Sequence, residues 1–97
     1  MIALEERLEK VRMSFRSKAA VRAQTLQVDL SSGNVGGLRS LAHDLHGMAG
    51  TFGFDTLGAH ARLLEEATIA HDHITDDIGQ KATALADALD ALAKEPH

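Results

Sequence analysis

The sequence predicts an all-α domain folded as an antiparallel up-down four-helix bundle. Alanine and leucine dominate the chain, the only proline is Pro96, and apolar residues recur at every third or fourth position. This spacing places apolar side chains on one stripe of a helix, whereas a half-buried strand would alternate apolar and polar residues. Short connections between helices of similar length favour antiparallel neighbours. The 97 residues are expected to form a single domain, residues 1–97, with a modest core.

The first helix is expected over residues 3–31, where eight apolar residues recur at spacings of three and four. Such a helix is long for a small domain. Because Ser17 could cap a second segment, a bend or a split near Arg16 is an alternative. Residues 31–37 form the first clear loop, rich in glycine and serine. The eight apolar residues are Leu4, Leu8, Val11, Phe15, Ala19, Ala23, Leu26 and Leu30.

Three further helices are predicted from residue types that are typical of helix ends. Asn34 is expected to cap a helix over residues 35–52 that ends at Gly53, a residue type that favours the position after a helix. A third helix is expected to begin near Phe54 or Asp55, and the charge of Asp55 suits a helix N-terminus. After a connector over residues 71–75, Thr75 is expected to cap the fourth helix. The expected inner faces are Leu57, Ala61, Leu64 and Ala67 in the third helix, and Ile78, Ala82, Leu85, Leu89 and Leu92 in the fourth.

The composition excludes several classes of protein. The chain has no cysteine, so disulfides and thiolate metal sites are excluded. No apolar run has the length of a membrane span or the character of a signal peptide, and we expect a cytoplasmic protein without a membrane partner. The net charge is −4, and the chain has three phenylalanines but no tryptophan or tyrosine. With so little to stack on bases, nucleic acid is not an expected partner.

The most informative segment, residues 43–53, lies within the predicted second helix. At about 100° per residue, His43 points almost directly away from the apolar stripe, and Gly47 and Gly50 lie beside it on the outer face. Each interior glycine costs a helix roughly 1 kcal/mol relative to alanine. The simplest reason for two of them here is that another protein must approach the imidazole. The stripe consists of Leu38, Leu41, Ala42, Leu45, Met48, Ala49 and Phe52.

This segment resembles the signature of histidine-containing phosphotransfer (HPt) domains, His-x-Leu-Lys-Gly-x-Ala-x-x-x-Gly. Residues 49–54 are especially similar to the phosphotransfer domain of chemotaxis-type histidine kinases. The resemblance implies a four-helix bundle that accepts a phosphoryl group on His43 and exchanges it with an aspartate of a response-regulator receiver domain. It implies no kinase activity of the domain's own, and a receiver domain or a histidine kinase as partner. The matching positions are His43, Leu45, Gly47, Ala49 and Gly53.

Two further residues are implicated through the resemblance. His46 replaces the usual lysine three residues after the phosphoacceptor, and histidine is only partly cationic near neutral pH. Transfer is therefore expected to be slower, tuned to pH, or specific to one partner. Attack through Nε2 requires the proton on Nδ1, and an ungapped alignment through residues 51–54 places Glu65 where chemotaxis-type domains carry the glutamate that orients the imidazole.

The resemblance also suggests the contact surface. Arg62 falls where those domains carry a histidine of the same network, and Arg39, one turn before His43, could attract phosphate. We expect Gly47, Gly50, Arg39 and Arg62 to contact the partner. The alternative for Arg39 is an ordinary solvated surface charge, and the alternative for Arg62 is a surface ion pair with Glu65. The Mg²⁺ for transfer is expected on the receiver domain, with no cofactor or metal on this chain.

A metal site and a docking module are the two alternative functions. His43 and His46, together with His71 and His73, could form a metal site, but bundle metal sites combine inward-facing histidines and carboxylates. The domain could instead dock on a receiver or kinase without accepting phosphate. We expect a monomer, either free-standing or part of a larger kinase. His60, at the border of the apolar stripe, is expected to be a partly buried structural residue.

Overall fold

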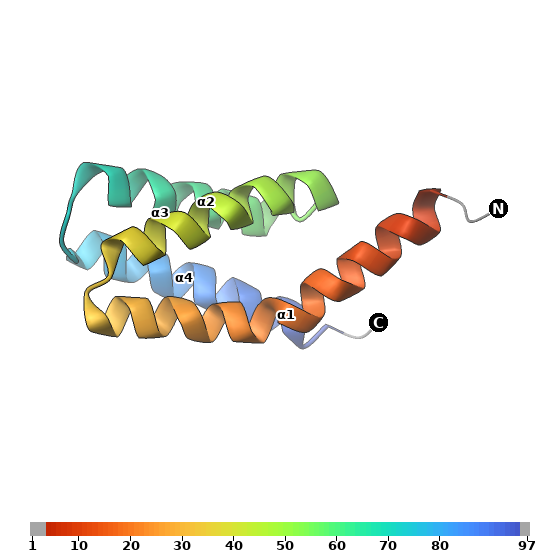
Figure 1. Ribbon diagram of the computed structural model, residues 1–97, viewed down its shortest axis with the longest axis horizontal. Helices are drawn as coiled ribbons and strands as arrows, with labels where there is room; N and C mark the ends of the chain where they lie inside the picture. Colours follow the sequence, from red (N-terminus) through yellow and green to blue (C-terminus); the bar gives the residue numbers. More distant parts are fainter. Residues whose placement is uncertain (1–3, 96–97) are drawn as a thin grey trace.

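The computed structural model describes residues 4–95 and contains four helices that run antiparallel to their neighbours in the chain (Figure 1). Helix α2 packs chiefly on α3, and α1 packs chiefly on α4. The described residues contain no strand, so the predicted four-helix bundle is confirmed. Residue 3, the expected start of the first helix, lies outside the described part. The helices are α1 (Leu4–Ser32), α2 (Val35–Phe52), α3 (Asp55–Ala70) and α4 (Asp76–Ala93).

Helix α1 is one continuous helix that changes direction in its orange part (Figure 1). The alternative of a split is therefore wrong, and Ser17 caps nothing, because it lies inside the helix. Its hydroxyl instead donates to the carbonyl oxygen of Ser14 at 2.8 Å. Serine side chains that bond back to the preceding turn often bend helices, which accounts for a bend without a break.

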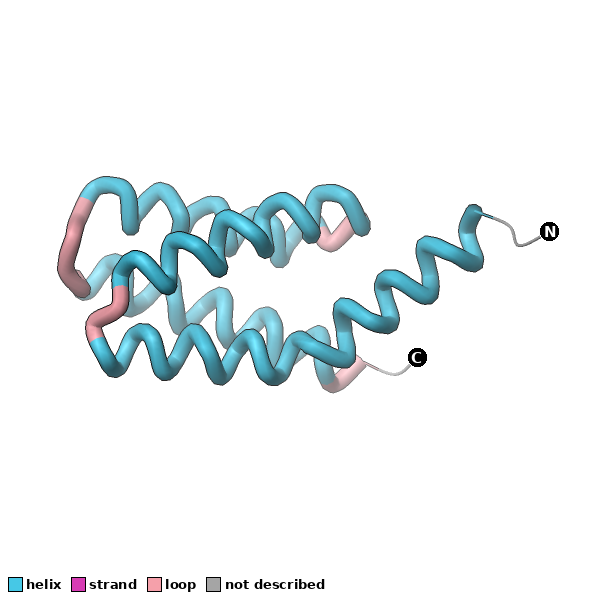
Figure 2. Tube along the Cα trace, viewed as in Figure 1, coloured by secondary structure: helices cyan, strands magenta, loops and turns pink. Residues whose placement is uncertain are grey.

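The first part of α1 projects beyond the other helices, as the tube in Figure 2 shows. The predicted apolar stripe is therefore wrong at its beginning: Leu4 is 70% exposed and Val11 is 40% exposed. Burial starts at Phe15, whose ring contacts Phe52 at the end of α2 and Phe54 before α3. Arg12 still reaches the end of α2, where its Nε donates to the carbonyl oxygen of Phe52 at 2.9 Å. Leu4 and Val11 stay exposed because this part of α1 projects beyond the other helices.

The predicted helix ends are confirmed by their hydrogen bonds. The Asn34 side chain accepts from the amide of Gly37 at 2.9 Å. Gly53 has φ 80°, the left-handed conformation that closes a helix and that glycine adopts without strain. The Thr75 hydroxyl accepts from the amide of Ile78 at 3.1 Å.

The core lies between the two helix pairs and contains every predicted inner-face residue of α3 and α4. Helices α2 and α3 approach closely at Gly58, where an added Cβ would lie 3.4 Å from the Cβ of Ala49. This close approach brings the flanks of α2 and α3 together on the outer side of the bundle. None of the described helices is long and apolar enough to span a membrane. The largest fully buried apolar side chains are Leu26, Leu38, Leu45, Leu64, Ile78, Leu85 and Leu89.

Candidate functional site

His43 stands on the outer side of α2, with 71% of its side chain exposed. Its helix neighbours Ala42 and Leu45 are fully buried, and they fix the rotation of α2 so that His43 points outward. The Nδ1 atom of His43 lies 2.6 Å from Oε2 of Glu65 on α3. A carboxylate only accepts hydrogen bonds, so Nδ1 carries the proton. When the ring is neutral, the lone pair of Nε2 is therefore free.

Glu65 is the acidic partner in this pair, and its side chain is only 19% exposed. The hydrogen bond with His43 lowers the pKa of Glu65 below its ordinary value, and partial burial opposes that shift more weakly. Glu65 is therefore ionised at neutral pH and presents a full negative charge to the imidazole.

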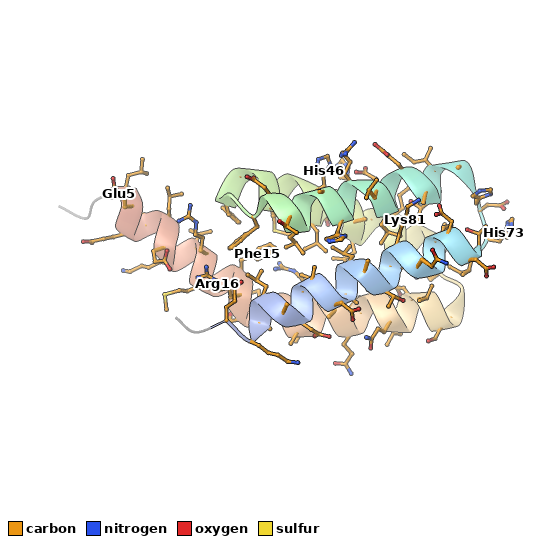
Figure 3. All side chains as sticks on the ribbon, turned by 180° about the vertical axis from the view of Figure 1, so that it is seen from behind. Glu5, Phe15, Arg16, His46, His73 and Lys81 are labelled. Atoms are coloured by element: carbon orange, nitrogen blue, oxygen red, sulfur yellow. The ribbon has the colours of Figure 1, made fainter. Side chains whose placement is uncertain are left out.

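The second histidine of the segment contacts the same carboxylate. His46 lies on the outer side of α2 (Figure 3), and its Nδ1 is 3.5 Å from Oε1 of Glu65. The two oxygens of Glu65 therefore face two different imidazoles.

The glycines of the segment leave the surface beside His43 open. A Cβ added at Gly47 or at Gly50 would meet no atom within 4 Å. Gly47 lies in a shallow groove that also includes His43, Met48 and Phe52. Packing inside the domain therefore does not explain the two glycines, and the space they leave is accessible to a partner.

Both arginines expected at the contact surface have polar partners on α3. Arg39 donates to the carbonyl oxygen of Thr68 near the end of α3, and the buried hydroxyl of Thr68 donates to the carbonyl oxygen of Glu65 at 2.7 Å. Arg62 pairs with Glu66 at 3.3 Å, so its ion pair is with the neighbouring carboxylate and not with Glu65.

The remaining histidines lie apart from this site. His60 is half-buried, as expected. His73 lies at the end of the bundle, far from His46 (Figure 3), and His71 is beside it with the two ring centres 5.8 Å apart. Within residues 4–95, no three histidine or carboxylate side chains gather in an arrangement that could hold a metal ion.

Two residues that position the site were not predicted from the sequence. Gly58 permits the close approach of α2 and α3, and Thr68 links Arg39 to the backbone of Glu65. A glycine inside a predicted helix was the available signal for Gly58, because an interior glycine is unfavourable without a packing reason. Thr68 carries no such signal, since its role depends on contacts across helices.

A family model described as Hpt domain matches residues 10–95 of the chain. The chain belongs to the Hpt domain family. Hpt domains are phosphotransfer modules of two-component phosphorelays that interact with kinases and receiver domains and have no kinase activity of their own. No match was found among curated proteins or among solved structures. The membership makes this Hpt domain a module of histidine phosphotransfer.

Proposed function

We propose that this Hpt domain accepts a phosphoryl group on Nε2 of His43 and exchanges it with the aspartate of a receiver domain. The observation that carries the proposal is the 2.6 Å contact between Nδ1 of His43 and Oε2 of Glu65. It holds the proton on Nδ1 and leaves the lone pair of Nε2 free for attack.

The transfer step follows from this arrangement. The Nε2 lone pair attacks the phosphorus of an aspartyl phosphate, a nitrogen–phosphorus bond forms, and the bond from phosphorus to the aspartate oxygen breaks. The aspartate leaves as a carboxylate, and the proton on Nδ1 stays in place. The ring gains positive charge as the bond forms, and ionised Glu65 stabilises that charge. Return transfer to an aspartate uses the same contacts in reverse.

The partner would dock on the outer face of α2. Gly47 gives an acidic pocket room to reach His43, and Met48 and Phe52 in the same groove offer half-buried apolar surface. Gly50 and Arg62, which line the next depression along with His46, would extend this contact. Such an interface is small and suits a transient complex. The Mg²⁺ for the step would belong to the receiver domain.

The runner-up is a docking module that binds a receiver or kinase domain without accepting phosphate. The exposure of His43 alone is compatible with both functions. The contact of Nδ1 with Glu65 separates the two functions, because a docking surface does not require a short contact from Nδ1 to an ionised carboxylate.

The proposal is tested by a transfer profile against the phosphorylated receiver domains of the source organism. We expect at least one receiver domain to transfer its phosphoryl group to the Hpt domain soon after the two are mixed. Nitrogen-15 and phosphorus-31 spectra should then place the phosphoryl group on Nε2 of His43. A receiver that binds the domain and retains its phosphate, with none of the others transferring, would support the docking module instead.

A further inference from the structure

We propose that the projecting part of α1, residues 4–14, pairs antiparallel with the same segment of a second copy of this chain. Two Hpt domains would then form a dimer through their projecting helices. The inference does not involve His43 and goes beyond the proposed function. It departs from the monomer expected from the sequence, because that expectation placed the apolar stripe of this segment inside the bundle.

The projecting part carries an apolar stripe that no other helix of the described structure covers. Leu4, Leu8 and Val11 continue the stripe that becomes buried at Phe15. Leu4 is 70% exposed, Val11 is 40% exposed and Leu8 is partly exposed. Their spacing of four and then three residues is that of the apolar seam of a coiled coil. A second helix laid along this face would cover all three side chains.

The helical conformation of this segment itself calls for a partner. Residues 4–14 make about three turns, a length of roughly 16 Å at 1.5 Å per residue. Isolated helices shorter than about 12–15 residues are marginal in water, and most helices in proteins are stabilised by packing of an apolar face. Arg12 is bound to the carbonyl oxygen of Phe52. Between Leu4 and Lys10, the described structure gives only ion pairs within α1, from Glu9 to Arg12 and Arg16.

The charges beside the stripe favour a second copy in the antiparallel direction. Glu5 and Arg12 are seven residues apart and therefore lie on the same flank of the stripe, and Arg7 lies on the other flank. A two-fold axis between antiparallel helices brings the same flank of each copy together. When Leu8 of one copy contacts Val11 of the other, Glu5 of each copy faces Arg12 of the other. A parallel pair would instead bring Arg7 of one copy to Arg12 of the other, which is repulsive.

Both members of this ion pair are available for it. Glu5 lies near the tip of the projecting part (Figure 3) and is exposed. Arg12 keeps 37% of its side chain exposed. Its Nε is bound to Phe52, which fixes the side chain and leaves the N–H groups of the other two nitrogens for a carboxylate.

The proposed contact leaves the phosphotransfer site accessible. His43 is nine residues before the end of α2, about 14 Å along the helix, and the projecting part extends beyond that end (Figure 1). An interface of two three-turn helices is small, so we expect a weak dimer with a dissociation constant between about 10 μM and about 1 mM.

The first test measures self-association of the full chain by sedimentation equilibrium over this concentration range. Glu5→Lys and Arg12→Glu each place like charges opposite one another twice in the dimer. Each should raise the dissociation constant about tenfold. Glu6→Lys and Lys10→Glu are the matched controls, because they make the same changes of charge on the side of the helix away from the stripe. They should associate like the wild type.

The second test mixes the two charge variants. An equal mixture of Glu5→Lys and Arg12→Glu should form heterodimers about as tightly as the wild type forms homodimers, because each basic position of one variant then faces an acidic position of the other. This recovery also excludes damage to the fold in Arg12→Glu as the cause of its weaker association. Val11→Ser should weaken association by about tenfold or more. Val21→Ser, exposed on α1 outside the stripe, should not.

Three results would overturn the proposal. The first is a wild type that stays monomeric up to about 1 mM, above the expected dissociation constant. The second is a mixture of the charge variants that does not recover association. The third is a Val11→Ser variant that binds a receiver domain more weakly but self-associates normally, because the stripe would then belong to the receiver contact. Phosphorylation of His43 by phosphoramidate, a small donor that needs no partner, should be the same in all variants and separates this test from that of the proposed function.

Discussion

Nδ1 of His43 and Oε2 of Glu65 lie 2.6 Å apart, although the two residues are 22 positions apart in the chain. Each side chain comes from the flank of its helix, and the close packing of α2 on α3 brings the two flanks together. The contact joins an exposed imidazole to a mostly buried carboxylate. It determines which ring nitrogen is free, and the predictions below follow from it.

Replacing Glu65 by glutamine should slow phosphorylation of His43 by phosphoramidate about tenfold at pH 8. The amide oxygen can still accept from Nδ1, but hydrogen bonds to a charged acceptor are stronger by about 1 kcal/mol or more. Glu66→Gln is the matched control, because Glu66 is exposed and pairs with Arg62. Similar rates for both variants would argue against an orienting role for Glu65.

The stability of the domain should depend on pH through Glu65. Its pKa lies below the ordinary value of 4.5, mainly because of the hydrogen bond with His43. A group with a lowered folded-state pKa stabilises the fold above its unfolded-state pKa, and this contribution is lost as the pH falls through the folded-state value. In urea unfolding, the wild type should be more stable than Glu65→Gln at pH 6, and the difference should shrink as the pH falls below 4.5. A difference that stays constant over this range would exclude ionised Glu65 as its source.

Replacing Gly47 by lysine should block transfer from a receiver domain while leaving the bundle intact. A Cβ at this position meets nothing inside the domain, and removing a helical glycine should raise stability by up to about 1 kcal/mol. Gly79→Lys is the matched control, since Gly79 in α4 is equally open and lies away from His43. Thermal unfolding and transfer rates measure the two effects. Transfer by Gly47→Lys at the wild-type rate would show that a partner does not need the open space at this position to reach His43.

Replacing Gly58 by valine should destabilise the domain by about 1–3 kcal/mol, because extra methyl groups would be forced against α2. An added Cβ alone already reaches within 3.4 Å of the Cβ of Ala49. The same substitution at Gly79 meets open space and should change stability far less. Urea unfolding of the two variants measures the difference, and equal free energies of unfolding would show that the approach of α2 to α3 does not depend on Gly58.

The sequence predicted the helices well because their signals are local. The caps at Asn34 and Thr75, the left-handed Gly53 and the inner faces of α3 and α4 depend on residues within a few positions of each other. The prediction that the first part of α1 is buried was wrong for a physical reason. Periodicity shows which face of a helix is apolar, but the positions of the neighbouring helices decide whether Leu4 and Val11 are buried.

The site was predictable to a smaller extent. The outward direction of His43 follows from helical geometry and the apolar stripe. Glu65 and Glu66 are adjacent and chemically alike, so only an alignment to a known family could choose between them. The structure places Glu65 at His43 and Glu66 at Arg62. The contact of His46 with Glu65 could not be predicted, because it depends on how α2 and α3 are rotated against each other.

The most direct test uses a receiver domain that carries radiolabelled phosphate and three forms of the Hpt domain. The wild type and His46→Gln should both acquire a label that is lost in acid and kept in base, as expected for a phosphorus–nitrogen bond, and His43→Gln should acquire none. His43 is exposed, so its replacement should leave the helical content unchanged. Label on His43→Gln at the wild-type level would contradict the assignment of His43 as the phosphoryl acceptor.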